Sequence, residues 1–193
     1  MSRHYKLHYA IVSGNCEECK TLLFAGANIN EIRPSSNEIY KSSGTTHLQL
    51  AIESKNIDIC RVLFNYGGAS STTRFPNGPT PFIYAVRHNT IDICNLLLEK
   101  GAVIEEEEYC LIHAVMSGYF EMSKFLLERR ANVHTKNEKG NNVLQYYYHN
   151  NGFEIAKLLL QYKVNVNDAN LVGETPLHTA ARSNNFIFCK LLW

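Results

Sequence analysis

Leu177-His178-Thr179-Ala180, near the end of the chain, is the last of a series of short apolar stretches that recur along the whole sequence. The earlier members are Leu7-His8-Tyr9-Ala10, Leu48-Gln49-Leu50-Ala51, Phe82-Ile83-Tyr84-Ala85, Leu111-Ile112-His113-Ala114 and Leu144-Gln145-Tyr146-Tyr147, the last with tyrosine in place of alanine. Their closing residues are 41, 34, 29, 33 and 33 positions apart. A period of about 33 residues, with a turn and two helices per unit, is typical of a solenoid of stacked repeats.

The second half of each unit keeps the same register. A leucine follows each closing residue by twelve positions, at Leu22, Leu63, Leu97, Leu126, Leu159 and Leu192. Four residues beyond it, the first three units carry Gly26, Gly67 and Gly101, and glycine commonly ends a helix because it adopts the left-handed conformation with little strain. Arg130 and Lys163 hold this position in the fourth and fifth units.

One stretch carries a family resemblance. Gly173-Glu174-Thr175-Pro176-Leu177-His178-Thr179-Ala180 resembles the G-x-T-P-L-H-x-A pattern of the ankyrin repeat family, and fragments of the same pattern are Gly78-Pro79-Thr80-Pro81-Phe82 and Gly26-Ala27-Asn28-Ile29-Asn30. The resemblance covers essentially the whole chain. It implies an all-α fold, an ankyrin-repeat solenoid of stacked helix-turn-helix units with β-hairpin fingers.

The residues themselves support that architecture. Thr80 and Thr175 are placed to cap an inner helix, and Pro81 and Pro176 fall at its first position, where no amide donor is needed. Asn142 can cap in the same way in the fifth unit. No helix pair of this kind buries its apolar face alone, so neighbouring units must stack.

The register predicts a single ankyrin-repeat domain over residues 1–193. Its repeats fall at about 1–30, 44–70, 76–104, 105–134, 138–167 and 171–193, the last of them incomplete. Residues 31–43 form an inserted loop, because the first interval exceeds the period by about eight residues. Because Leu191-Leu192-Trp193 stops within an outer helix, we expect the sequence to be part of a longer protein.

Composition excludes several classes of protein. The chain is 45% hydrophobic and 19% charged, which argues against a disordered chain, and its 19 basic and 18 acidic residues are scattered, which argues against a nucleic-acid partner. No leader or membrane span is evident, so we expect no direct membrane insertion. The expected location is the cytoplasm, of a host cell if the protein is viral, with the nucleus left open as an alternative.

The cysteines and histidines invite a metal or disulfide interpretation, which the register disfavours. Cys19, Cys60, Cys94 and Cys189 all lie nine residues after their closing alanines, a position that Ser123 and Ala156 hold elsewhere, and we interpret it as a packing position for small residues. Cys16 shares its position with Ile57 and Ile91 and is predicted to lie in the core. In the family resemblance, His8 and His178 help to tie the start of the inner helix to the neighbouring finger. We therefore expect no metal and no cofactor.

No catalytic motif is present. The sequence has no nucleophile elbow, phosphate-binding glycine loop or paired metal-binding histidines on a helix, so the protein is predicted not to be an enzyme.

The predicted contact surface consists of finger tips and the open side of the inner helices, as in the family. Side chains there differ from one repeat to the next, whereas the core positions hardly change. The candidate protein-binding residues are Tyr40, Ser43, Thr45, Glu53, Asn77, Arg87, His88, Met116, Lys139, Asn141, His149, Asn150, Glu174 and Arg182.

Three irregular segments leave alternatives open. The insertion, with Tyr40, either binds a partner or is a neutral surface loop. The acidic run Glu105-Glu106-Glu107-Glu108 either binds a basic partner or only keeps a shortened finger exposed to water. We favour the second interpretation. Tyr147, in place of the alanine, predicts a local distortion of the inner helix.

The favoured function is a non-catalytic protein–protein interaction module that binds one partner protein through its concave face. It could serve as a host-factor-intercepting protein or a ubiquitin-ligase substrate receptor, since the repeats resemble ankyrin proteins of poxviruses. The alternative is an ankyrin segment of a larger channel, toxin or enzyme that acts as a structural or oligomerisation scaffold.

Overall fold

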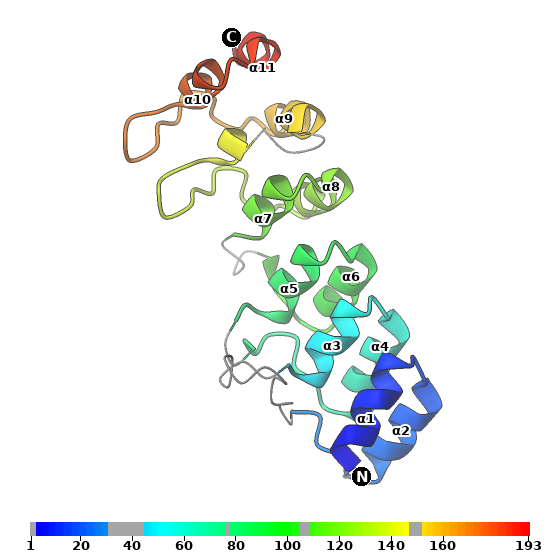
Figure 1. Ribbon diagram of the computed structural model, residues 1–193. Coiled ribbons are helices and arrows are strands. Elements are labelled where there is room, and N and C mark those ends of the chain that lie inside the picture. Colours follow the sequence, from blue (N-terminus) through cyan, green and yellow to red (C-terminus); the bar gives the residue numbers. More distant parts are fainter. Residues whose placement is uncertain (1–2, 31–44, 76–77, 105–108, 147–151) are drawn as a thin grey trace. The chain divides into compact units, whose positions relative to one another are not determined.

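The computed structural model describes residues 3–30, 45–75, 78–104, 109–146 and 152–193. Contacts group the chain into two compact units, Met1–Val103 and Ile104–Trp193. Each unit is built from pairs of short helices (Figure 1). The insertion, the acidic run and Tyr147 lie outside the described residues.

The first unit contains two layers of helices. The inner layer comprises α1 (Arg3–Val12), α3 (His47–Glu53) and α5 (Pro81–Arg87), and the outer layer comprises α2 (Cys16–Phe24), α4 (Ile57–Tyr66) and α6 (Ile91–Glu99). Each inner helix packs on its own outer helix, and successive helices of a layer pack on one another. This is the predicted stacking of helix-turn-helix units.

The second unit repeats the plan with one change. Its elements are α7 (Cys110–Met116), α8 (Phe120–Glu128), the 3-10 helix η3 (Val143–Tyr146), α9 (Gly152–Gln161), α10 (Pro176–Arg182) and α11 (Phe186–Leu192). The inner position of the fifth repeat is held by η3, which packs against α7, α9 and α10. Its four residues end just before Tyr147, where the sequence predicts a distortion.

The closing alanines are the core of each helix pair. Ala10, Ala51, Ala85, Ala114 and Ala180 are each at most 1% exposed. Their carbonyl oxygens accept a hydrogen bond from the backbone N–H five residues later, at 2.9–3.1 Å. The residue before that donor has a positive φ in every case, at Gly14, Lys55, Asn89, Gly118 and Asn184. A left-handed residue thus turns the chain from the inner to the outer helix of each of these pairs.

The recurring leucines end the outer helices in a similar way. Leu63, Leu97, Leu126 and Leu159 are at most 1% exposed, which places them in the core between repeats. Their carbonyls accept from the N–H groups of Ala69, Ala102, Ala131 and Val164 at 3.0–3.3 Å. Arg130 and Lys163, in the predicted glycine position, have φ of 65° and 59°.

The predicted helix caps are confirmed. The Thr80 and Thr175 side chains accept hydrogen bonds from the N–H groups of Ile83 and His178, and Pro81 and Pro176 follow at the first helical turn. The Asn142 side chain accepts from the N–H of Leu144 at 3.0 Å. These contacts fix where the inner elements begin, and therefore where the fingers end.

The described fingers are tight turns closed by backbone hydrogen bonds. Phe75 donates to the Pro79 carbonyl at 3.1 Å, Asn137 to Asn141 at 3.0 Å, and Asn170 to Glu174 at 2.9 Å. Lys136 and Asn142 form an isolated antiparallel bridge at the base of one finger. The two fingers of the second unit thereby project their tips beside the starts of η3 and α10.

Candidate protein-binding surface

In the first unit, the predicted contact residues surround an aromatic cluster on α5. The Tyr84 hydroxyl donates to the Glu53 carboxylate of α3. The Tyr84 ring meets Phe75 edge-on with centroids 5.3 Å apart and lies 4.7 Å from the His88 ring. Burial, reinforced by the Glu53 carboxylate, raises the pKa of Tyr84 above its ordinary value, so the hydroxyl stays a donor at neutral pH. Glu53 and His88 are thus held at defined positions.

The other two described candidates of this unit lie at the ends of inner helices. The Arg87 side chain is exposed at the end of α5, and Thr45 is half-buried just before the cap of α3. The candidates of this unit come from α3, α5 and the chain entering α3, which are neighbours in the inner layer.

In the second unit, the structure brings Met116 and Lys139 together. Both line an open pocket of about 250 Å³ between α7 and the finger that precedes η3. Ile112 and Tyr146 contribute buried apolar surface to the pocket, and the Met116 side chain is 38% exposed. The Tyr146 hydroxyl accepts from the Asn137 side chain at 2.6 Å, which ties the finger to η3. The pocket is therefore framed by fixed groups.

Two of the remaining candidates of this unit, Asn141 and Glu174, belong to fingers that are tied together, and the third is Arg182 of α10. The Asn141 side-chain oxygen accepts from Asn170 at 2.8 Å, and the Leu171 N–H donates to the Lys139 carbonyl at 3.0 Å. The Glu174 carboxylate forms an ion pair with Arg182 of α10. The two finger tips thus form one continuous edge.

Five predicted contact residues lie outside the described residues. They are Tyr40, Ser43, Asn77, His149 and Asn150.

Comparison with known proteins identifies the fold. The sequence model of the family described as ankyrin repeats (3 copies) matches residues 7–108 and 111–193. The chain belongs to the ankyrin repeat family. Ankyrin repeats are generally protein–protein interaction modules, and the fold is typically a non-catalytic scaffold.

One relative of this ankyrin protein is viral. The chain is 29% identical over 133 residues, or 67% of its length, to an ankyrin repeat protein of fowlpox virus (strain NVSL). The match spans only 29% of that protein's length.

Solved ankyrin structures are similar over nearly the whole chain. An ankyrin repeat domain from Acinetobacter baumannii AYE has a TM-score of 0.77 and 25% identity, with 97% of this chain and 96% of that chain covered. The human ASB11 ankyrin repeat domain has a TM-score of 0.76 and 26% identity, with 96% and 81% covered. The ankyrin repeat domain of Bcl-3, at 22% identity and a TM-score of 0.66 with 90% and 92% covered, shows the same fold.

The ankyrin repeats use their histidine position for capping. The Thr175 N–H donates to His178 Nδ1 at 3.3 Å, and the Gln49 and Gln145 side chains accept from the N–H groups of Thr46 and Asn142 in the same way. The tie to the neighbouring finger, which the resemblance implies for histidine, is made by Gln145, whose amide donates to the Glu174 carbonyl at 3.1 Å.

The cysteines of this ankyrin chain are free thiols set for packing. Cys19, Cys60 and Cys94 are fully buried, and burial raises the pKa of Cys19 and of Cys60 to about 12. Cys16 is half-buried rather than in the core, because its position lies at the start of the outer helix, where Ile57 is also half-buried. Within the described ranges, no group of three or more His, Cys, Asp or Glu residues is arranged to hold a metal ion.

The structure adds two features to the predicted contact surface. Tyr84 belongs to one of the recurring apolar stretches, yet its hydroxyl reaches the exposed Glu53. Leu171 and Val172 are 79% and 78% exposed at the tip of a finger. Sequence reasoning missed Leu171, whose position between Asn170 and Gly173, both turn-forming residues, is a signal that could have found it.

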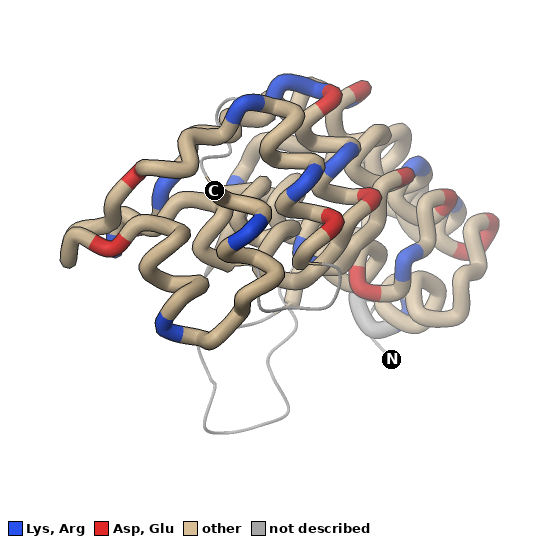
Figure 2. The backbone as a smooth tube through the Cα atoms, turned by 90° about the horizontal axis from the view of Figure 1, so that it is seen from above, with Lys and Arg blue, Asp and Glu red and all other residues tan. Residues whose placement is uncertain are grey.

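Charge is mixed over the described backbone. Lys and Arg are interspersed with Asp and Glu on the described backbone (Figure 2), and ion pairs such as Lys136 with Asp168 at 3.5 Å join opposite charges. Among the described residues, no helix has the length and apolar character needed to cross a bilayer.

Proposed function

We propose that the protein is a non-catalytic interaction module that binds a partner protein along its inner helices and finger tips. The observation that carries this proposal is the contrast between uniform buried positions and varied exposed ones. The five closing alanines and four of the six recurring leucines are buried, whereas the exposed positions carry acidic, basic and apolar side chains, at Glu53, Arg87, Met116, Lys139 and Arg182. A uniform scaffold with a varied surface suits recognition of one protein.

We further propose that the partner is a protein of an infected host cell. The support is the fowlpox virus relative. The mixed charge of the surface favours a protein over a nucleic acid as partner, because a nucleic acid requires a basic patch. The alternative, a structural or oligomerisation scaffold within a larger channel, toxin or enzyme, predicts that these surface residues bind no host protein.

The test is recovery of bound proteins from an avian cell lysate, chosen because the relative comes from fowlpox virus. The contact variant carries Arg87→Ala and Lys139→Ala. A matched control carries Arg61→Ala and Lys124→Ala, which remove the same charges from exposed positions on the outer helices α4 and α8. Circular dichroism confirms that both variants fold.

A protein captured by the parent chain and by the control, but lost with the contact variant, supports the proposal. Equal capture by both variants would place binding elsewhere on the molecule, and no specific capture by the parent chain would favour the scaffold alternative.

A further inference from the structure

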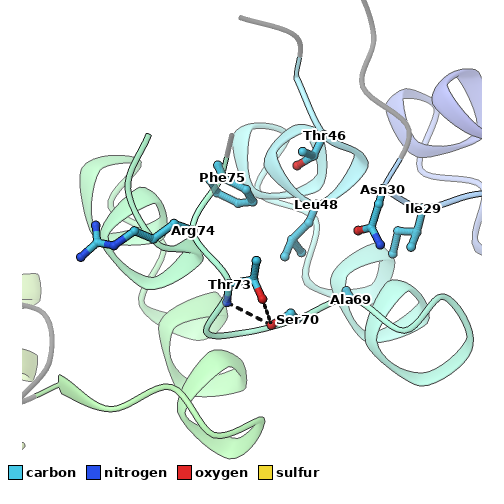
Figure 3. Close-up of a pocket in the computed structure, with 9 residues that line it drawn as sticks. All are labelled: Ile29, Asn30, Thr46, Leu48, Ala69, Ser70, Thr73, Arg74 and Phe75. Carbon is cyan, nitrogen blue, oxygen red and sulfur yellow. Dashed lines mark hydrogen bonds between the residues drawn. The ribbon is translucent and has the colours of Figure 1, made fainter. Parts of the chain in front are cut away.

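The first unit has an apolar pocket that the candidate residues do not use. Its volume is about 200 Å³, and nine residues line it, namely Ile29, Asn30, Thr46, Leu48, Ala69, Ser70, Thr73, Arg74 and Phe75 (Figure 3). Ile29, Leu48 and Phe75 form an apolar floor and are themselves 5–7% exposed. The pocket is of a size for one large apolar side chain, not for a helix.

The walls of the pocket are fixed by local hydrogen bonds. The Ser70 hydroxyl accepts from the Thr73 N–H at 3.0 Å and from the Thr73 hydroxyl at 2.8 Å (Figure 3). The Phe75 N–H is bound to the Pro79 carbonyl, and the Phe75 ring rests edge-on against Tyr84. The shape is therefore formed before any partner arrives, which lowers the entropy cost of binding.

The charge at the rim has one sign. Arg74 is the one charged residue among those that line the pocket, and the others on the rim are hydroxyl or amide side chains. Within the described part of the chain, the exposed Arg74 guanidinium forms no hydrogen bond or ion pair. It extends away from the apolar floor (Figure 3). A carboxylate paired with it would accordingly belong to a residue beside the one in the pocket.

We infer that this pocket receives a large apolar side chain of a partner protein whose neighbouring residue is acidic. The inference rests on the proposed function, since it adds an anchor point for a protein partner. Burial of the apolar side chain contributes binding free energy, and the ion pair between the adjacent carboxylate and Arg74 makes the pocket specific for partners with an acidic residue there.

The test uses two pools of short unstructured peptides. In one pool, a leucine, methionine or phenylalanine is flanked by aspartate; in the other, the aspartate is replaced by lysine. Binding is measured by NMR titration of the ¹⁵N-labelled chain, with the Ala69, Thr73 and Phe75 amides as reporters. We expect the acidic pool to bind at least about threefold more tightly and to shift these amides, because an exposed ion pair contributes up to ~1 kcal/mol.

Two variants separate the contributions of the apolar pocket and of Arg74 to peptide binding. Ala69→Leu fills the pocket and should weaken binding of the acidic pool at least about tenfold, since burial of a large apolar side chain is worth ~1.5–3 kcal/mol. Arg74→Glu should reverse the preference so that the lysine pool binds more tightly. Arg61→Glu, the same charge change on α4, should leave the preference unchanged.

Several outcomes would overturn the inference. They are equal binding of both pools, no effect of Ala69→Leu in a variant with a native spectrum, or a preference that survives Arg74→Glu. A dimer in sedimentation that Ala69→Leu dissociates would show instead that a second copy fills the pocket. If the captured host protein depends on Arg87 and Lys139 but not on Ala69, the inference fails while the proposed function stands.

Discussion

At the scale of single residues, the chain relies on polar side chains that complete the start of each inner element. Gln145 is the most heavily used of these. It is 2% exposed, accepts from the Asn142 N–H at 3.0 Å, and donates to the Glu174 carbonyl at 3.1 Å and the Thr179 hydroxyl at 3.4 Å. It therefore links two repeats as well as capping its own.

The substitution Gln145→Met should lower the free energy of unfolding by about 2 kcal/mol. It keeps the side-chain volume but leaves buried donors and acceptors without partners, which costs ~1–3 kcal/mol. Urea denaturation followed by circular dichroism measures the effect. Gln49→Met is the matched control, because Gln49 holds the same position and is half-buried. Among the described residues, its side chain accepts a hydrogen bond from Thr46 alone, so the loss of stability should be below about 1 kcal/mol. Equal losses would contradict the linking role of Gln145.

The buried thiols should be inert while the protein is folded. The reactive form is the thiolate, and the pKa of Cys60, raised to about 12 by burial, keeps the thiol protonated at pH 8. We expect iodoacetamide at pH 8 to label Cys60 only after urea is added, as measured by peptide mass spectrometry. The half-buried Cys16 serves as the comparison and should react first. Rapid labelling of Cys60 in the folded chain would show that its helix opens readily.

The residue scale is also where sequence reasoning reached its limit. The caps at Thr80 and Thr175 were predictable, because capping depends on residues within one turn. The aromatic cluster of Tyr84 was not, since it joins α3, α5 and a finger, and a pattern within one repeat carries no information on contacts between repeats. The apolar pocket beside Ala69 was not predictable for the same reason, because its walls come from three successive segments.

At the scale of elements, the fingers of the second unit are the most constrained part of the predicted surface. Asn170 organises one finger by accepting from the N–H groups of Val172 and Glu174, and it joins the preceding finger through Asn141. Gly140 has a φ of 75°, and a Cβ there would lie 2.9 Å from the Leu171 backbone nitrogen, so any side chain would collide with the next finger. The exposed Leu171 and Val172 are thus displayed on a stiff support.

The substitution Asn170→Ala should loosen this finger. We expect the amides of Val172 and Glu174 to exchange hydrogen about five- to tenfold faster, because each loses a hydrogen bond worth ~1–1.5 kcal/mol. Hydrogen exchange observed by NMR measures the rates. Asn167→Ala is the control, since Asn167 is an exposed asparagine of the same finger whose side chain makes no hydrogen bond within the described residues. Unchanged exchange in Asn170→Ala would show that the backbone turn suffices.

At the scale of the whole molecule, the repeat plan was predictable and the grouping of repeats was not. The period and the buried alanines follow from a pattern that every unit shares. The two compact units depend on how many contacts each interface makes, and no single repeat reveals that. One continuous domain over 1–193 remains a prediction.

A cavity created by substitution in one unit should destabilise mainly that unit. Leu63 and Leu126 hold the same register position and are fully buried, one in each unit. Replacement of either by alanine should cost ~2–5 kcal/mol, and in a solenoid the loss is felt mainly by neighbouring repeats. Hydrogen exchange with mass spectrometry should show faster exchange chiefly in the unit that carries the substitution. Equal acceleration in both units by either variant would mean that the chain unfolds as one cooperative body.

The left-handed helix ends at Arg130 and Lys163 carry a meaning for how this chain can diversify. Their φ values are positive, like those of Gly26 and Gly101 at the same position, and the hydrogen bonds from Ala131 to Leu126 and from Val164 to Leu159 are present. The backbone hydrogen bonds therefore specify the turn, and the turn forms without glycine at this position. A charged residue can therefore replace glycine at these helix ends, which changes the outer surface while the backbone fold stays the same.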